Sequence, residues 1–489
     1  MDLVGLLAFA FFYAVTFYVG YLAHKRLKQN QGSGEQFMLA SRKLPLWIGL
    51  GTMTATWVGG GYINGTAEVV YSQGLVWTQA PWGYGLSLIL GGLLFAGIMR
   101  KRRYVSLLDP FAERYGKKVT ALLYIPAFSG DLFWSASILA ALGYTVSGVL
   151  NVDYTHAVVV SASVAVAYTL LGGLLAVAYT DLAQLIFILI GLGLVIPYAV
   201  TSGGGLETLY AKYSAISFAP EGAAFASWTW SDNALLLIPG GIPWGVYFQR
   251  ILACPDTQTA KRLSFWSGII CVLFAIPPTL LGMVGAVTDW HALGLEAPVG
   301  SMVLPYIFKY LTPYWIGILG ASVVAAGVMS SVDSSILSAS YMFVWNVLVP
   351  FNARLAQHIT RLTQIAVLVM GALATSLALH VKSVYALWYL CSDFVYVVLF
   401  PQLCVVLFLP FAHARGAVAG FVIAIVTRLL FGEQTLGVSS FFGLPTENFP
   451  FRTLCMLSSM FTIIAVSWVM KKGTVPSVPL VGQTEPSPF

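Results

Sequence analysis

Two carboxylates stand among hydroxyl groups in stretches apolar enough to lie inside a membrane. Asp333 occurs in the run VMSSVDSSILSAS, and Asp181 occurs in GGLLAVAYTDLAQ, between Thr180 and Gln184. A carboxylate in hydrocarbon is costly unless it is paired or holds an ion, and oxygen ligands suit a small hard cation such as sodium. The sequence therefore predicts cation sites here. Two simpler interpretations stay open: the serines only form a close-packing helix face, and Asp181 only marks the end of a span.

Aromatic side chains inside the apolar stretches form a second group with a chemical use. The set comprises Trp57, Tyr84, Trp134, Trp244 and Trp388. The faces of Trp and Tyr rings attract a desolvated cation, and a box of such rings suits a quaternary ammonium, which cannot donate an N–H hydrogen bond to a carboxylate. The alternative is an ordinary aromatic belt at the membrane interface. Together with the carboxylates, the set predicts a quaternary amine transported with sodium.

Both groups need interrupted helices to position them, and the sequence contains two. The run GTMTATWVGGGYINGTAE, residues 51–68, carries Gly59, Gly60 and Gly61 in a row, and LLLIPGGIPWGVYFQR, residues 235–250, carries Pro239 and Pro243 around two glycines. Such breaks expose backbone carbonyls that bind ions and polar substrates in secondary transporters. The alternative for the glycines is a packing face against a neighbouring helix.

The composition places these segments in a membrane. Of 489 residues, 58% are hydrophobic and only 9% are charged, and the mean hydropathy is +0.82, which excludes a water-soluble globule. The five cysteines show no disulfide or metal-binding spacing. Helix is the expected state of every span. Thirteen stretches qualify: 3–23, 45–71, 75–99, 119–149, 155–175, 177–201, 232–253, 263–288, 303–348, 358–380, 383–410, 414–431 and 451–470.

Basic residues in the connecting loops predict the orientation. An N-terminus outside the cell makes alternate loops cytoplasmic, and these loops then hold most of the 25 Lys and Arg residues, including those from Arg100 to Lys118 and from Arg250 to Arg262. The C-terminus is then cytoplasmic, and residues 473–489 are expected to form a short disordered tail. The basic residues lie at membrane edges, so they do not indicate nucleic acid as a partner.

The motifs identify a family. GGLLAVAYTDLAQ is similar to the signature G-G-x-x-x-V-x-x-T-D-x-x-Q of the sodium/solute symporters, the family of the sodium/glucose cotransporters. Longer runs resemble the choline-importing members of that family, and the resemblance extends from about residue 5 to 472. These runs are TMTATWVGGGYINGTAE, GGIPWGVYFQR, VMSSVDSSILSAS and LWYLCSDFVY.

The resemblance implies a fold and a function. The fold is an all-α polytopic membrane protein of 13 transmembrane helices in one domain, residues 1–472. It has a LeuT-type five-plus-five inverted repeat, with core repeats at about 45–201 and 232–410, one extra N-terminal helix and two extra C-terminal helices. The function is sodium-coupled, chloride-dependent import of choline across the presynaptic plasma membrane, supplying acetylcholine synthesis, with choline and membrane lipid as partners.

The resemblance also assigns site residues. Choline would bind in a cage of Trp57, Tyr84, Trp134, Trp244 and Trp388. One sodium would bind to backbone carbonyls and hydroxyls of Ala55, Val58, Gly327, Ser330 and Ser331. A second sodium, found in some members, would bind to Asp181, Asp333 and Ser334.

The chain departs from the choline-importing members at several positions. They carry Gln where Gly245 stands and Glu where Asp131 stands, which puts affinity and pocket shape in question. Gly327 replaces an alanine, and a longer cytoplasmic tail with trafficking signals is expected in those members. Asn64, in the Asn-x-Thr sequence, is expected to be buried and not glycosylated.

Three alternatives to choline import stay open. The first alternative is a sodium symporter for another small solute, such as a betaine-like amine, a sugar or a carboxylate. The second is a channel or a sensor that binds choline without accumulating it. A membrane enzyme is the third alternative, but no nucleophile with a base, no metal cluster and no phosphate-binding loop occurs at a recognisable spacing.

Overall fold

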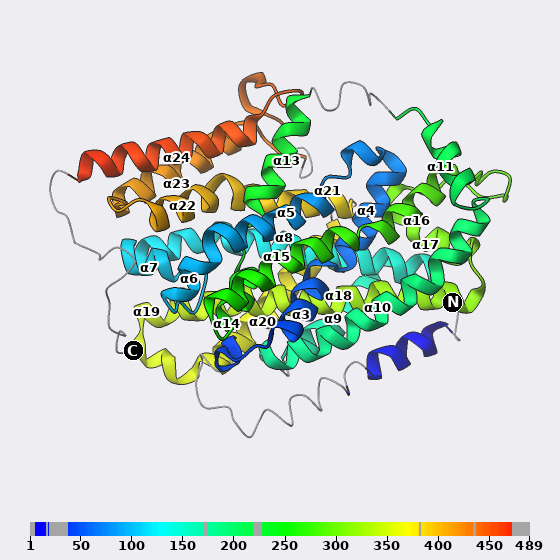
Figure 1. Ribbon diagram of the computed structural model, residues 1–489, viewed down its shortest axis with the longest axis horizontal. Helices are drawn as coiled ribbons and strands as arrows, with labels where there is room; N and C mark the ends of the chain where they lie inside the picture. The colour runs from blue at the N-terminus through cyan, green and yellow to red at the C-terminus, as the bar shows by residue number, and fades with distance from the viewer. Residues whose placement is uncertain are drawn as a thin grey trace.

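The computed structural model describes residues 5–15, 18, 38–170, 174–218, 227–380, 383–433 and 437–471. Long helices lie roughly along one direction in a single bundle (Figure 1). Eight helices in the described ranges are long and apolar enough to cross a membrane. The expectation of an all-helical polytopic membrane fold is thus confirmed, as it must be where lipid cannot satisfy backbone hydrogen bonds. The two interrupted helices and two shorter apolar helices, Gly5–Val15 and Tyr154–Ala167, fall outside this group, so thirteen full crossings are not established.

The first interrupted helix consists of α3, Leu46–Trp57, and α4, Gly60–Ser72. Helical geometry stops at Val58, and Gly59 is extended, with φ −86° and ψ −176°. A Cβ atom on Gly59 would lie 1.9 Å from the Ser331 hydroxyl oxygen, so no other residue fits there without displacing its neighbour. The predicted break is confirmed, and the same glycine also permits the close helix packing that was its alternative interpretation.

The second interrupted helix consists of α13, Trp228–Gly240, and α14, Gly245–Ala253. Pro239 lies in the last turn of α13, and Trp244 is extended, with φ −109° and ψ 134°, immediately before α14 begins. Because a proline lacks the N–H group and fixes φ, the two prolines of this run favour the interruption. This predicted break is also confirmed.

Counted from α3, the interrupted helices are the first and the sixth of ten segments. The second to fifth segments are α5 (Ala80–Gly91) with α6 (Gly97–Lys101), α8 (Lys117–Leu150), α9 (Tyr154–Thr169) and α10 (Leu174–Ser202). The seventh to tenth are α15 (Thr257–Leu273) with α16 (Ile276–Val287), α18 (Tyr314–Met342), α20 (Ile359–His380) and α21 (Val384–Phe394) with α22 (Phe400–Phe408). After these, α23 (Ala414–Leu430) and α24 (Phe451–Met470) pack against each other beside α22 (Figure 1).

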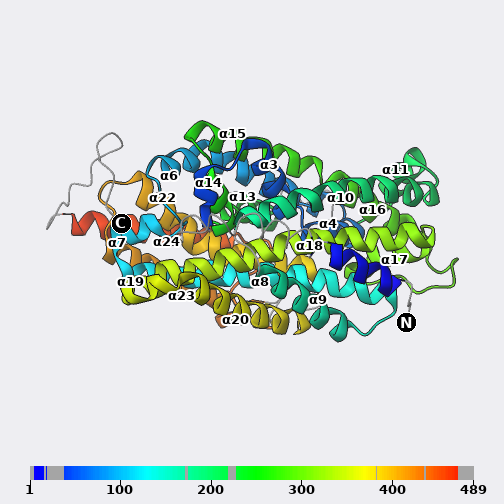
Figure 2. The ribbon, with the colours of Figure 1, turned by 90° about the horizontal axis from the view of Figure 1, so that it is seen from below.

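Helix α18 runs through the middle of the molecule, where it contacts α3, α4, α8 and α10 (Figure 2). Its sequence is rich in Gly, Ala and Ser, and every residue from Gly320 to Met342 is buried. Small residues allow helix backbones to approach closely in a membrane, where packing rather than hydrophobicity drives association. The serine-rich run therefore lies against both halves of the first interrupted helix.

Shorter elements mark the two ends of the bundle. Helices α11 (Leu206–Ser214) and α17 (Val303–Tyr310) lie at one end, and α7 (Asp109–Tyr115) and α19 (Val349–Phe351) lie at the other (Figures 1 and 2).

One predicted span is wrong, and others extend beyond the described residues. The stretch 303–348 is two helices, because α17 ends at Tyr310 and α18 begins at Tyr314, after the extended Pro313. A proline that breaks the run of amide donors explains the boundary. The first span, 3–23, is described as helix only over Gly5–Val15, and the predicted tail, 473–489, lies outside the described residues.

Candidate substrate and ion sites

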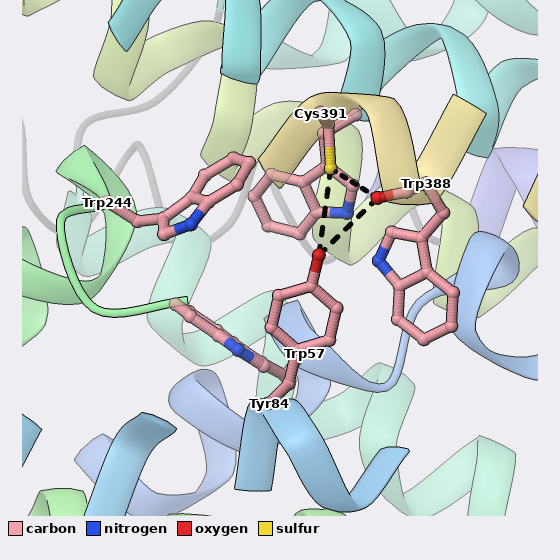
Figure 3. Close-up of a pocket in the computed structure, with 6 residues that line it drawn as sticks. Trp57, Tyr84, Trp244, Trp388 and Cys391 are labelled. Atoms are coloured by element: carbon pink, nitrogen blue, oxygen red, sulfur yellow. Dashed lines mark hydrogen bonds between the residues drawn. The ribbon is translucent and has the colours of Figure 1, made fainter. Parts of the chain in front are cut away.

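The five predicted cage residues line one small pocket together with Cys391 (Figure 3). They come from five separate segments, namely α3, α5, α8, the residue before α14, and α21. Each of the five side chains is at most 7% exposed. The interfacial-belt interpretation is therefore wrong for this set, because belt residues face the membrane surface.

The rings of the pocket contact one another in two groups. Trp57 and Trp134 have ring centroids 6.0 Å apart, and Trp134 and Trp244 are 5.3 Å apart in an edge-to-face arrangement. Tyr84 stacks on Trp388 with centroids 5.3 Å apart. Such a wall of aromatic faces attracts a cation through the ring quadrupoles, most strongly where water is excluded.

The interruption before α14 orients one of these rings. The Trp244 indole N–H donates a 2.8 Å hydrogen bond to the Gly240 carbonyl, which has been released at the end of α13. The free carbonyl at a helix end is thus satisfied by a side chain of the same segment. As a result, the indole is held at the pocket wall by the break itself.

Polar atoms occupy the Tyr84 side of the pocket. The Tyr84 hydroxyl pairs with the Ser392 hydroxyl, and it lies 3.4 Å from the Trp388 carbonyl and 3.8 Å from the Cys391 sulfur. The Cys391 thiol donates to the Trp388 carbonyl at 2.8 Å. Sequence reasoning missed Cys391, although its position three residues after Trp388 places both on one helix face.

The first predicted sodium residues meet where α18 crosses the break between α3 and α4. The Ser330 hydroxyl lies 2.8 Å from the Ala55 carbonyl and 3.0 Å from the Gly327 carbonyl. The Ser331 hydroxyl donates to the Thr56 carbonyl at 2.8 Å. A Cβ atom on Gly327 would stand 3.4 Å from the Val58 carbonyl oxygen. We call these five residues the neutral oxygen cluster: Ala55, Val58, Gly327, Ser330 and Ser331.

The second predicted sodium residues form a charged group that contains an unpredicted arginine. Asp181, Asp333, Ser334 and Arg250 are each at most 1% exposed, and we call them the charged cluster. One Arg250 nitrogen, Nη2, lies 3.3 Å from Asp181 Oδ2 and 2.6 Å from the Ser334 hydroxyl. The span-end interpretation of Asp181 is wrong, because this residue is fully buried within α10.

Three carboxylate oxygens of the charged cluster have no hydrogen-bond partner of normal geometry among the described residues. They are both oxygens of Asp333 and Oδ1 of Asp181. The other Asp181 oxygen also accepts a 2.5 Å hydrogen bond from Thr52. Unpartnered buried carboxylate oxygens are expensive, and they are the kind of ligand that a cation satisfies.

The position of Arg250 differs from the sequence-based prediction, which placed this residue in a cytoplasmic loop. It lies within α14 and is fully buried, so it contributes nothing to a cytoplasmic charge bias. Its guanidinium also donates to Thr52, Thr56 and the Val246 carbonyl. The useful signal was the pair of membrane carboxylates, because a buried carboxylate is stabilised by an oppositely charged partner.

The other membrane acids have different surroundings. Glu68 accepts from the Ser383 hydroxyl and the Tyr385 amide, and so caps the start of α21. Asp393 pairs with Arg428 and Arg452. Asn64 is 2% exposed and donates to the Ala141 carbonyl at 3.0 Å, which confirms that it is buried.

Comparisons with known proteins agree with this architecture. High-affinity choline transporter 1 of Caenorhabditis elegans is 42% identical and covers 95% of this chain and 85% of its own length. High affinity choline transporter 1 of Homo sapiens is 44% identical, over 96% of this chain and 87% of its own length. The substrate-bound outward-open structure of a sodium-coupled sialic acid symporter has a TM-score of 0.79 at 16% identity, covering 96% of this chain and 98% of its own.

That structural likeness concerns the fold alone, whereas the sequence comparisons define membership. The model of the Sodium:solute symporter family matches residues 37–424, which include both interrupted helices, the aromatic pocket and all residues of the two oxygen clusters. The chain belongs to the Sodium:solute symporter family.

Proposed function

We propose that the protein imports choline together with sodium across the plasma membrane by alternating access. The observation that carries the proposal is the pocket, in which five buried aromatic side chains from five segments surround one space. Relatives at 42–44% identity that are named as choline transporters support the same substrate. The family is one of transporters, which sets the enzyme alternative aside.

The pocket suits the trimethylammonium end of choline. That group has no N–H bond to offer, so a carboxylate cannot grip it by hydrogen bonding, whereas ring faces attract it from any direction. Each desolvated cation–π contact contributes about 2 kcal/mol or more. Trp57 and Trp244, from the two interrupted helices, face this group.

Sodium at the neutral oxygen cluster couples ion binding to the pocket. Trp57 lies between Ala55 and Val58, so a cation held by the carbonyls of these two residues fixes the last turn of α3 against α18 and places the Trp57 indole. Choline then binds to a pocket that is already ordered, which is coupling by differential affinity. The membrane potential adds about 2.3 kcal/mol per charge for each 100 mV.

The charged cluster is our second candidate for sodium, with Asp181, Asp333 and Ser334 as ligands. The unpartnered oxygens of Asp333 support it.

Further parts of the proposal rest on the family resemblance: chloride dependence, the five-plus-five inverted repeat with thirteen crossings, the outside N-terminus, and a presynaptic role in acetylcholine synthesis. The positions of the two interrupted helices, first and sixth, support the repeat.

The test is uptake of labelled choline into proteoliposomes under an inward sodium gradient, with lithium replacing sodium in parallel. We expect concentrative uptake that requires sodium. Trp57→Ala should lower choline affinity more than tenfold, because it removes one wall of the pocket. Sodium-driven currents with sugars or carboxylates but not choline would contradict the substrate, and choline binding without accumulation would indicate a channel or sensor instead.

A further inference from the structure

The aromatic pocket has two chemically different sides. Trp57, Trp134 and Trp244 form a run of ring contacts at one side. The Tyr84 hydroxyl, the Cys391 thiol and the Trp388 carbonyl gather at the other, and the Tyr84 hydroxyl points toward both of its neighbours (Figure 3). A ligand that fills the pocket therefore meets an apolar, cation-attracting wall and a hydrogen-bonding end.

The hydrogen-bonding end has unused capacity. Tyr84 and Ser392 each carry one O–H donor and two acceptor lone pairs, and their mutual hydrogen bond uses one donor and one acceptor. The nearest other acceptor, the Trp388 carbonyl, already receives the Cys391 thiol at 2.8 Å and is 3.4 Å from the Tyr84 oxygen. A ligand hydroxyl can therefore pair with Tyr84 without breaking the Tyr84–Ser392 bond.

Ser392 positions the Tyr84 hydroxyl from outside the pocket. Its side chain is fully buried and does not line the pocket, whereas the Tyr84 ring does. The serine thus fixes the direction of the phenol, and the phenol presents the polar atom to the ligand. Stacking of the Tyr84 ring on Trp388, with centroids 5.3 Å apart, restricts the phenol further.

We propose that the Tyr84 hydroxyl, positioned by Ser392, hydrogen-bonds the hydroxyl group of the transported amine, so that the pocket selects a hydroxyalkyl ammonium over an alkyl ammonium of equal size. The inference rests on the proposed function, because it takes a quaternary ammonium at the tryptophan side as given. A neutral hydrogen bond in a buried site corresponds to about a fivefold to tenfold preference.

The experiment compares choline with n-propyltrimethylammonium, in which a methyl group replaces the hydroxyl. Equilibrium binding of both is measured on the purified, sodium-loaded protein. The wild-type protein should bind choline about fivefold to tenfold more tightly. Tyr84→Phe should weaken choline binding by that factor and leave binding of the alkyl compound within about twofold, so that the preference disappears.

Tyr247→Phe is the matched control. The Tyr247 hydroxyl also pairs with a buried serine, Ser264, at 2.8 Å, and its ring lies 6.4 Å from that of Trp57, but Tyr247 does not line the pocket. This variant loses the same kind of buried Tyr–Ser hydrogen bond, and it should keep the wild-type preference for choline. Ser392→Ala provides a second route if Tyr84→Phe does not fold, and it should reduce the preference in the same direction.

The outcomes separate this inference from the proposed function. An equal loss of both ligands in Tyr84→Phe would overturn the inference and leave the aromatic pocket intact, because the ring alone would then matter. A wild-type protein that binds both compounds equally would also overturn it. Failure of the wild-type protein to bind either ammonium would instead reject the proposed function.

Discussion

Two oxygen clusters lie within about one helical turn of each other on α18, yet they differ in charge. The neutral oxygen cluster offers carbonyls and hydroxyls only, and its Ser330 hydroxyl on α18 donates to the Ala55 carbonyl in the last turn of α3. The charged cluster holds two carboxylates and a guanidinium, and Arg250 already pairs with Asp181 and Ser334. Both clusters are buried from solvent.

In the proposed function, this difference means that one helix provides two kinds of cation site. A cation at the neutral oxygen cluster would replace its hydration shell with backbone dipoles and would meet no competing charge, although the Ser330 hydroxyl already bonds to the Ala55 and Gly327 carbonyls. At the charged cluster, the proposed sodium would share its ligands with Arg250, and Asp333 is the member of this cluster with both carboxylate oxygens unpartnered among the described residues. We therefore expect substitutions in the charged cluster to change both folding and sodium dependence, and substitutions of the Ser330 hydroxyl in the neutral oxygen cluster to change sodium dependence alone.

The largest effect on stability is expected at Arg250. Arg250→Met leaves two buried carboxylates without their internal cation and should destabilise the protein by about 3–5 kcal/mol, measured as the loss of folded protein on heating in detergent. Arg100→Met is the matched control, because Arg100 is only 8% exposed and its guanidinium donates to the Cys254 and Pro255 carbonyls rather than to a carboxylate. A melting temperature for Arg250→Met as high as that of the control would contradict the distinction between the clusters.

A smaller effect is expected at Asp333, whose carboxylate has no hydrogen-bond partner of normal geometry in the described part of the chain. Asp333→Asn removes the charge but keeps the shape, so the fold should survive while the sodium concentration for half-maximal uptake rises about tenfold or more, since one such factor corresponds to about 1.4 kcal/mol. Sodium titration of choline uptake measures this. Unchanged sodium dependence would mean that Asp333 serves Arg250 alone.

The smallest effect is expected at Gly327 in the neutral oxygen cluster. A Cβ atom there would lie 3.2 Å from the Gly59 carbonyl carbon and the Gly60 nitrogen, which requires a shift of a few tenths of an ångström. Because the carbonyl ligand is kept, Gly327→Ala should change sodium affinity by about twofold or less. Gly59→Ala is the comparison variant, because its new Cβ atom would lie 1.9 Å from the Ser331 hydroxyl oxygen. This variant should abolish uptake. Equal effects of the two variants would argue against the tight contact between Gly59 and Ser331.

Local sequence was enough to predict the interruptions, because three glycines or two prolines act within one or two turns of the helix. It also indicated the aromatic set, whose members are unusual by residue type, although their use as a choline site is our proposal. Arg250 was assigned to a loop because its partners, Asp181 and Ser334, are distant in sequence and come together only in the folded chain. The boundary before α18 was missed despite Pro313, since apolar residues continue on both sides.

The most direct test of the account is the dependence of choline binding on sodium in Ser330→Ala. Ser322→Ala on the same helix is its control, because the one partner of the Ser322 hydroxyl among the described residues is the Ile318 carbonyl of its own helix. Choline affinity is measured by equilibrium binding across a sodium titration. The account predicts that Ser330→Ala shifts the titration to about fivefold higher sodium, while choline affinity at saturating sodium stays near the wild-type value. An unshifted titration, matching that of Ser322→Ala, would contradict the claim that sodium at the neutral oxygen cluster orders the pocket.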